Sequence, residues 1–229
     1  MYKLDYLKIS TFNAQQQQKE FIMSESVQVY IKDKLENGID IRDILDIINT
    51  SIPPHLTKEI DSIYVGMFDE FNKMETNAAY KDGAIYVSNK QDDEQDLIDD
   101  IVHEIAHSLE IPHGYLIYGD GKIEREFLQK RKKLYNILKE EDLNPDSDLM
   151  MDSEYSLELD NFLYKIVGYD RLNFICASYN LFTSAYCATS LREYFANGFE
   201  YYFLDDRGYL ENICPELYIK IQELHEDGS

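Results

Sequence analysis

The chain has 229 residues, of which 44% are hydrophobic and 29% charged, so it is long enough to bury a proper core and ordinary in composition for a globular protein. Its 44 acidic and 22 basic side chains give a formal net charge of −22, which argues against nucleic acid as a partner because a phosphate backbone would be repelled. No stretch approaches 18 consecutive apolar residues, so the sequence predicts no membrane span. Three cysteines, an odd number, do not predict a disulfide framework.

The beginning of the chain predicts an N-terminal arm over residues 1–20, followed by a single domain over 21–229. The arm alternates apolar and charged residues and lacks the apolar core of a signal peptide, so a chain that starts here is not expected to be exported by that route. Apolar positions at near-helical spacing predict a helix over 21–36. A second short helix is predicted over 41–48, with Asp40 as its N-cap.

Strands and then helices follow, which predicts an α+β fold. Residues 60–68 and 84–87 predict strands, the second one after a turn at 81–83. The clearest helix spans 92–110, with an acidic first turn, one continuous apolar stripe and an end marked by Pro112 and Gly114. The rest of the chain predicts a polar loop over 142–153 and helices over 123–141, 154–167, 190–204 and 215–225.

The helix at 92–110 carries the run His103-Glu104-Ile105-Ala106-His107, an HExxH pattern. Residues four apart project from one face of a helix, so His103 and His107 can reach the same metal ion. Glu104 lies one step round the helix, where it can take a proton from a zinc-activated water without binding the metal. The sequence therefore predicts one Zn²⁺ per chain, with Glu104 as general base.

A catalytic zinc site needs a third protein ligand, and one candidate is His113. It lies ten residues after His103, as in the metzincin pattern HExxHxxGxxH. That pattern has a glycine where this chain has Glu110, and a glutamate resists the left-handed turn by which the chain leaves the helix there.

The other candidate is Glu193, on the predicted helix at 190–204, which would make a gluzincin-type site. Asn197, four residues further on, would share its helix face and could hold a ligating imidazole by the second ring nitrogen. Ser190 and Glu193 also fit a capping box, which would give Glu193 a purely structural role.

Together, the HExxH helix and the run Glu193-Tyr194-Phe195-Ala196 resemble the catalytic domain of anthrax lethal factor and the related Pro-Pro endopeptidases. The resemblance extends from about residue 40 to the end, apart from an extra segment at about 143–180 that could form an added helical lobe. It implies a zincin-like metallopeptidase fold, with a small mixed sheet, an HExxH active-site helix and a mainly helical C-terminal half. It also implies a catalytic role for Tyr186, seven residues before the glutamate, in stabilising the oxyanion or protonating the leaving amine.

The activity implied by this resemblance is that of a secreted, toxin-like zinc metalloendopeptidase, expected to be a monomer that cuts a basic or proline-containing peptide or protein. By analogy with other zincins, the strand at 84–87 would form a sheet edge, placing Ile85 and Tyr86 near the substrate. Two alternatives stay open from the residues themselves. One is a metzincin-like protease with His113 as third ligand, and the other is an inactive zincin domain that serves as a binding module of a toxin assembly.

Overall fold

The computed structural model describes residues 20–24, 26–68 and 76–227. The predicted arm therefore lies outside the described residues, except for Glu20. The chain divides into two compact units, Met1–Ser108 and Leu109–Ser229, and the single domain over 21–229 stays a prediction. No helix in the described parts of the chain has the length and apolar character needed to cross a membrane.

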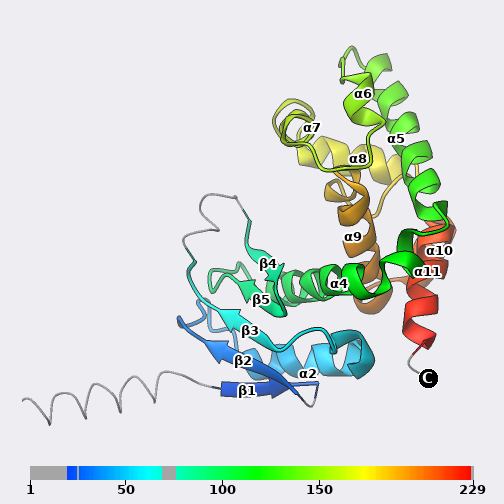
Figure 1. Ribbon diagram of the computed structural model, residues 1–229. Coiled ribbons are helices and arrows are strands. Elements are labelled where there is room, and N and C mark those ends of the chain that lie inside the picture. The colour runs from blue at the N-terminus through cyan, green and yellow to red at the C-terminus, as the bar shows by residue number, and fades with distance from the viewer. Residues whose placement is uncertain (1–19, 25, 69–75, 228–229) are drawn as a thin grey trace, which may run out of the picture. The chain divides into compact units, whose positions relative to one another are not determined.

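A mixed five-stranded sheet forms the first unit, and its strand order is β1-β2-β3-β5-β4 (Figure 1). The three central strands run parallel, and each outer strand pairs antiparallel with its neighbour. The strands are β1 (Glu20–Met23), β2 (Val27–Ile31), β3 (Ser62–Val65), β4 (Ala78–Lys81) and β5 (Ala84–Val87). The described fold is thus α+β with a small mixed sheet, as the sequence predicts.

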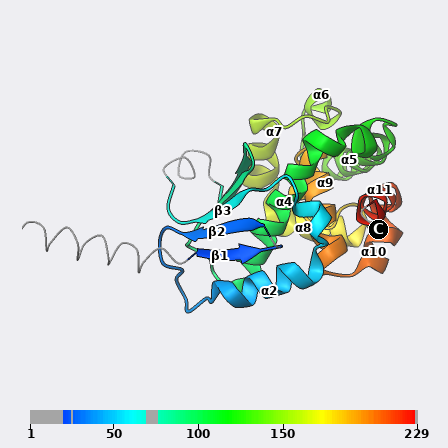
Figure 2. The same cartoon turned by 60° about the horizontal axis from the view of Figure 1, so that its bottom comes forward.

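One face of this sheet forms the core of the first unit. Val29, Ile63 and Ile85 lie in register on adjacent strands and are fully buried. Helix α2 (Ile41–Ser51), with Asp40 as its predicted N-cap, lies beside β1 and buries its own apolar stripe (Figure 2). A short 3₁₀ turn, η1 (Pro54–Thr57), links this helix to β3.

The helix predicted over 21–36 is wrong, because this segment forms the hairpin of β1 and β2. Met23, Val27 and Val29 are all fully buried, and between the strands Ser24 takes a left-handed φ of 47°. Over so short a run, a mixture of apolar and charged residues fits the period of a helix as well as that of a strand. The β-branched residues of β2 and its pairing with the distant β3 decide the outcome in favour of strand.

The expectation that 84–87 forms a sheet edge is also wrong. These residues form β5, which pairs with β3 on one side and with β4 on the other. The turn between β4 and β5 was predicted, and Asp82 and Gly83 have the positive φ values typical of a tight hairpin. Among the described strands, β4 therefore stands at this end of the sheet, and the side chain of Ile85 points into the core.

The helix predicted over 92–110 is present as α4 (Glu94–Tyr118), which contains His103 and His107 and continues beyond the predicted end. Pro112 lies inside the helix, where it removes one backbone hydrogen bond without ending it. Ile117, beyond the proline, is fully buried, so packing of the following turn favours continuation. The chain leaves the helix only after Tyr118, where Gly121 takes a left-handed φ of 65°.

Helices make up the second unit. The predicted helices at 123–141, 190–204 and 215–225 are confirmed within a few residues, whereas the helices at 169–178 and 207–213 were not predicted. The predicted loop at 142–153 contains the short α6, and the predicted helix at 154–167 starts later and ends as a π-helix. The elements are α5 (Lys122–Glu140), α6 (Ser147–Met150), α7 (Leu157–Asn161), the π-helix η2 (Phe162–Val167), α8 (Tyr169–Ser178), the 3₁₀ turn η3 (Tyr186–Ala188), α9 (Leu191–Leu204), α10 (Arg207–Ile213) and α11 (Pro215–Glu226).

Helix α9 lies at the centre of this unit and contacts η3, α5, α10 and α11. Its Tyr194 packs against Phe127 and Phe182, with ring centroids 5.5 and 5.7 Å away. Gly198 lets α11 approach closely, since a Cβ at this position would lie 2.3 Å from Cδ2 of Leu217. The helix that carries Glu193 is therefore fixed by packing along its length.

Candidate metal centre

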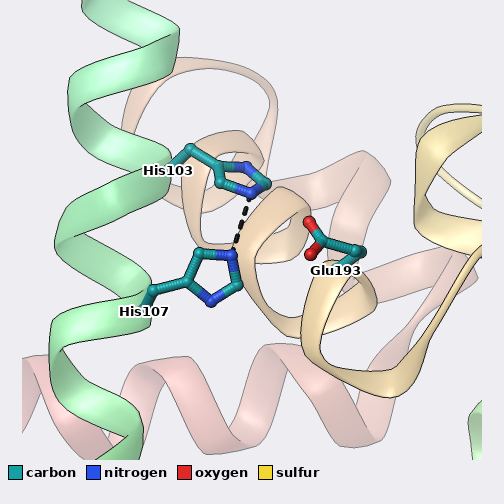
Figure 3. Close-up of side chains that lie close together, drawn as sticks. All are labelled: His103, His107 and Glu193. Carbon is teal, nitrogen blue, oxygen red and sulfur yellow. Dashed lines mark hydrogen bonds between the residues drawn. The ribbon is translucent and has the colours of Figure 1, made fainter. Parts of the chain in front are cut away.

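The two histidines of the HExxH motif project side by side from α4 (Figure 3). Their Nε2 atoms are 3.1 Å apart, and the ring planes are inclined by 74°. Two nitrogens bound to one tetrahedral ion at ~2.0–2.1 Å lie roughly 3.3 Å apart, so His103 and His107 already have the spacing of ligands that share a metal.

Glu193 completes a group of three candidate ligands with His103 and His107. One ligand atom from each residue lies within 4.8 Å of the others, and all three residues are half-buried. Figure 3 shows the Glu193 carboxylate turned toward the two imidazoles. Two imidazoles and one carboxylate are a donor set that suits Zn²⁺ and leaves a fourth position for water or substrate. The residues present therefore fit a divalent metal ion.

Capping and metal binding do not compete at the start of α9. The Ser190 side chain accepts a hydrogen bond from the backbone N–H of Glu193 at 3.2 Å, which caps the helix. This bond uses the backbone of Glu193 and leaves its carboxylate to join the two histidines. The capping interaction therefore positions the candidate ligand and does not exclude it.

Glu104 is buried, with 7% of its surface exposed, and lies outside the ligand group. Its Oε2 accepts a hydrogen bond from the backbone N–H of Tyr80 in β4 at 2.6 Å. The carboxylate is thus held beside the outer strand of the sheet, one residue after His103 on α4. A general base that must not bind the metal needs a fixed position of this kind.

His113 does not join the ligand group. It stays on α4, ten residues after His103, and a helix rises ~1.5 Å per residue, so the two Cα atoms are roughly 15 Å apart along the axis. The turn that a metzincin makes after its second histidine is absent from this described segment. The structure therefore gives no support to His113 as the third ligand.

Sequence reasoning missed three residues that join α4 to α9. Arg192 donates from both Nε and Nη2 to Oε2 of Glu110, and Tyr118 donates to Oε1 of the same carboxylate at 2.6 Å. Burial and the adjacent charge of Glu110 raise the pKa of Tyr118, so its hydroxyl stays a neutral donor. The only signal in the sequence for this contact was Glu110, which stands where the metzincin pattern has a glycine.

The structure gives Asn197 contacts other than the predicted one. Its Oδ1 accepts a hydrogen bond from the Ser184 hydroxyl at 2.7 Å, and its Nδ2 donates to the backbone carbonyl of Glu193 at 3.1 Å. These bonds tie the first turn of α9 to the segment before it. Asn197 therefore supports the backbone of the candidate ligand, and its contact with an imidazole stays a prediction.

Tyr186 lies in the 3₁₀ turn η3, which packs against α9, and its side chain is 38% exposed. Its ring lies 6.5 Å from the ring of Tyr169, which comes from the extra segment. Tyr169 and Tyr155 both donate hydrogen bonds to the carboxylate of Asp160, at 2.9 Å each. The extra segment thus brings a cluster of tyrosines, which sequence reasoning missed, to the region around Tyr186.

Burial and the bond to Asp160 raise the pKa of Tyr155 to about 12, and the charge of Glu193 adds to this effect. The electrostatic influence of Glu193 indicates that this part of the extra segment lies near the candidate ligand. The backbone agrees, because the N–H of Leu191 donates to the carbonyl of Ser153 at 2.8 Å. Burial also raises the pKa of Tyr169, so Tyr155 and Tyr169 are neutral hydrogen-bond donors at neutral pH.

Comparison of the chain with protein-family models, curated proteins and solved structures finds no match in any of the three. The resemblance to lethal factor and the Pro-Pro endopeptidases therefore depends on the residues quoted for it.

Proposed function

We propose that this protein is a zinc metalloendopeptidase of gluzincin type, similar to the lethal factor catalytic domain and the Pro-Pro endopeptidases. The observation that carries the proposal is the group of His103, His107 and Glu193, with the buried carboxylate of Glu104 next to it in the sequence. Two imidazoles, a glutamate from a second helix and a non-ligating glutamate are the parts that such hydrolysis requires.

Each residue has a separate role in the proposed reaction. His103, His107 and Glu193 would hold the ion, and Zn²⁺ bound there would supply Lewis-acid polarisation of water and of the scissile carbonyl. Glu104 would accept the proton of the attacking water and pass it to the leaving amine. Tyr186 would donate its hydroxyl proton as a hydrogen bond to the oxygen on which negative charge develops.

The proposed substrate is a peptide or protein with basic or proline-containing sequence. A net charge of −22 favours a cationic partner, because long-range attraction raises the rate of encounter. Secretion as a toxin-like enzyme belongs to the same proposal, through the resemblance to lethal factor.

The proposal is tested first by zinc content per chain after dialysis, for wild type, Glu193→Ala and His113→Ala. We expect one zinc in wild type and in His113→Ala, and a loss in Glu193→Ala. A diverse peptide library then tests hydrolysis by the zinc-loaded wild type. A zinc-loaded chain that cuts no peptide would contradict the proposed peptidase activity and favour a binding module. A preparation that holds iron in place of zinc would contradict zinc as the metal.

A further inference from the structure

Glu110 and Arg192 form an ion pair in which the carboxylate is buried and the guanidinium is exposed. The Glu110 side chain is 8% exposed and the Arg192 side chain 61% exposed, and the two form an ion pair at 2.5 Å. Arg192 places both Nε and Nη2 on one oxygen, while Tyr118 bonds the other at 2.6 Å. Both carboxylate oxygens of Glu110 therefore have charged or phenolic donors.

These residues adjoin the candidate ligands on both helices. Glu110 follows His107 by three residues, so it lies about one turn further along α4. Arg192 immediately precedes Glu193, in the first turn of α9. The ion pair therefore joins the turn of α9 that carries the glutamate ligand to the helix that carries both histidines.

A ligand in the first turn of a helix needs such support, because helix ends fray and a metal site tolerates errors of only ~0.2 Å in ligand distance. A guanidinium that donates twice gives direction as well as charge. We propose that Glu110, Arg192 and Tyr118 form a positioning clamp that holds Glu193 in place and so sets the metal affinity of the site. This inference rests on the metal site of the proposed function, but not on peptide hydrolysis.

For a change at Arg192, the effect of charge and the effect of positioning on metal affinity have opposite directions. This residue is therefore the sharpest test of the clamp. Removing a positive charge beside a cation site strengthens cation binding by Coulomb's law. Loss of a positioning residue weakens it, by about 10–100-fold for groups that orient metal ligands. A change at Glu110 is less informative, because charge and positioning then act in the same direction.

The experiment measures the zinc dissociation constant by competition with a chromophoric chelator. We expect Arg192→Ala to raise it about 10–100-fold, and Arg192→Lys and Tyr118→Phe to raise it less. The matched control is Arg171→Ala, which breaks the ion pair with Glu141 in the same unit and should leave zinc affinity unchanged. The visible spectrum of the cobalt-loaded Arg192→Ala protein should shift toward that of Glu193→Ala.

Several outcomes would overturn the clamp. Wild-type or tighter zinc affinity in Arg192→Ala contradicts it, as does an equal loss in Arg171→Ala. If Arg192→Ala does not fold, Arg192→Lys and Tyr118→Phe decide, and unchanged affinity in both contradicts the proposal. A wild type that binds no zinc overturns the clamp and the proposed function together, whereas a wild type that binds zinc but cuts no peptide overturns only the enzyme.

Discussion

The position of Glu104 in the HExxH motif separates proton transfer from metal binding. It follows His103 directly, yet the helix turns it away from the ligand face, and it accepts the N–H of Tyr80. A carboxylate in this position can move protons without competing for the metal. At the scale of the residue, the proposed reaction therefore depends on side-chain direction on α4 more than on distance along the chain.

Glu104→Gln should separate metal binding from hydrolysis. The amide keeps the shape and can still accept the Tyr80 hydrogen bond, but it cannot take up a proton. We expect unchanged zinc content and a fall in kcat/KM of ~10²–10⁴-fold, the usual contribution of a general base. Zinc analysis and peptide kinetics on the same preparation measure both, and full activity in the variant would remove Glu104 from the mechanism.

The three buried cysteines should be protected from thiol reagents, and their burial should make the stability of the protein fall at alkaline pH. Burial raises the pKa of Cys176 and Cys214 to about 12, whereas unfolded thiols ionise near pH ~8.5. The folded state thus keeps protons that the unfolded state loses. The free energy of unfolding should therefore be highest below pH ~8.5 and fall as pH rises toward 12.

Urea unfolding at pH 8 and pH 10.5 measures this fall, and replacing both Cys176 and Cys214 by alanine should reduce it. Thiol labelling at pH 8 provides a second check, with no fast reaction in the native protein and three reactive thiols in urea. Rapid labelling of the native chain would contradict the burial of these side chains.

At the scale of the element, helix α9 carries the candidate ligand Glu193, and the contacts of this helix determine where that residue lies. Ser190 caps it, Asn197 bonds back to its first turn, and Gly198 allows α11 to pack closely. None of these contacts needs a metal. We infer that α9 forms as part of the helical unit and presents Glu193 before metal binds.

Gly198→Ala and Gly114→Ala are the same substitution in two helices, and we expect opposite effects on the free energy of unfolding. At Gly198 the new Cβ would lie 2.3 Å from Leu217, so overpacking should destabilise the protein by about 1–3 kcal/mol. At Gly114, on α4, no atom lies within 4 Å of the new Cβ, so the higher helix propensity of alanine should stabilise by about 0.5–1 kcal/mol. Urea unfolding of both variants tests the pair, and a destabilised Gly114→Ala would contradict the helix through Pro112.

At the scale of the whole molecule, Glu193 is far from His103 and His107 in the sequence, and the three candidate ligands lie together only in the folded chain. An ion that binds the native state alone stabilises it through mass action. The metal site should therefore be visible as a change in overall stability, without any assay of activity.

Zinc at about 100 times its dissociation constant should add ~2.7 kcal/mol to the free energy of unfolding, and a chelator should remove this gain. The melting temperature of wild type with zinc and with chelator measures the effect. Glu193→Ala should lose most of the response, and His113→Ala should keep it. A chelator effect that persists in both Glu193→Ala and His103→Ala would indicate another metal site.

Interactions within a helix or a turn were the part that the sequence determined by itself. His103 and His107 lie four residues apart, so any helix brings them to one face, and the same holds for the cap at Asp40 and the turn at 81–83. The periods of the longer helices predicted α4, α5, α9 and α11, and the strands predicted before them indicated the overall α+β character.

Tertiary structure decided whatever depends on a partner distant in the sequence. The segment at 21–36 forms strands because β2 pairs with β3, and β5 became an interior strand because β4 pairs with it. Burial of Ile117 favours α4 continuing past Pro112, which keeps His113 on the helix and outside the group of candidate ligands. The bonds from Arg192 to Glu110 have no local signature, since their energy comes from a long-range contact that only the folded chain creates.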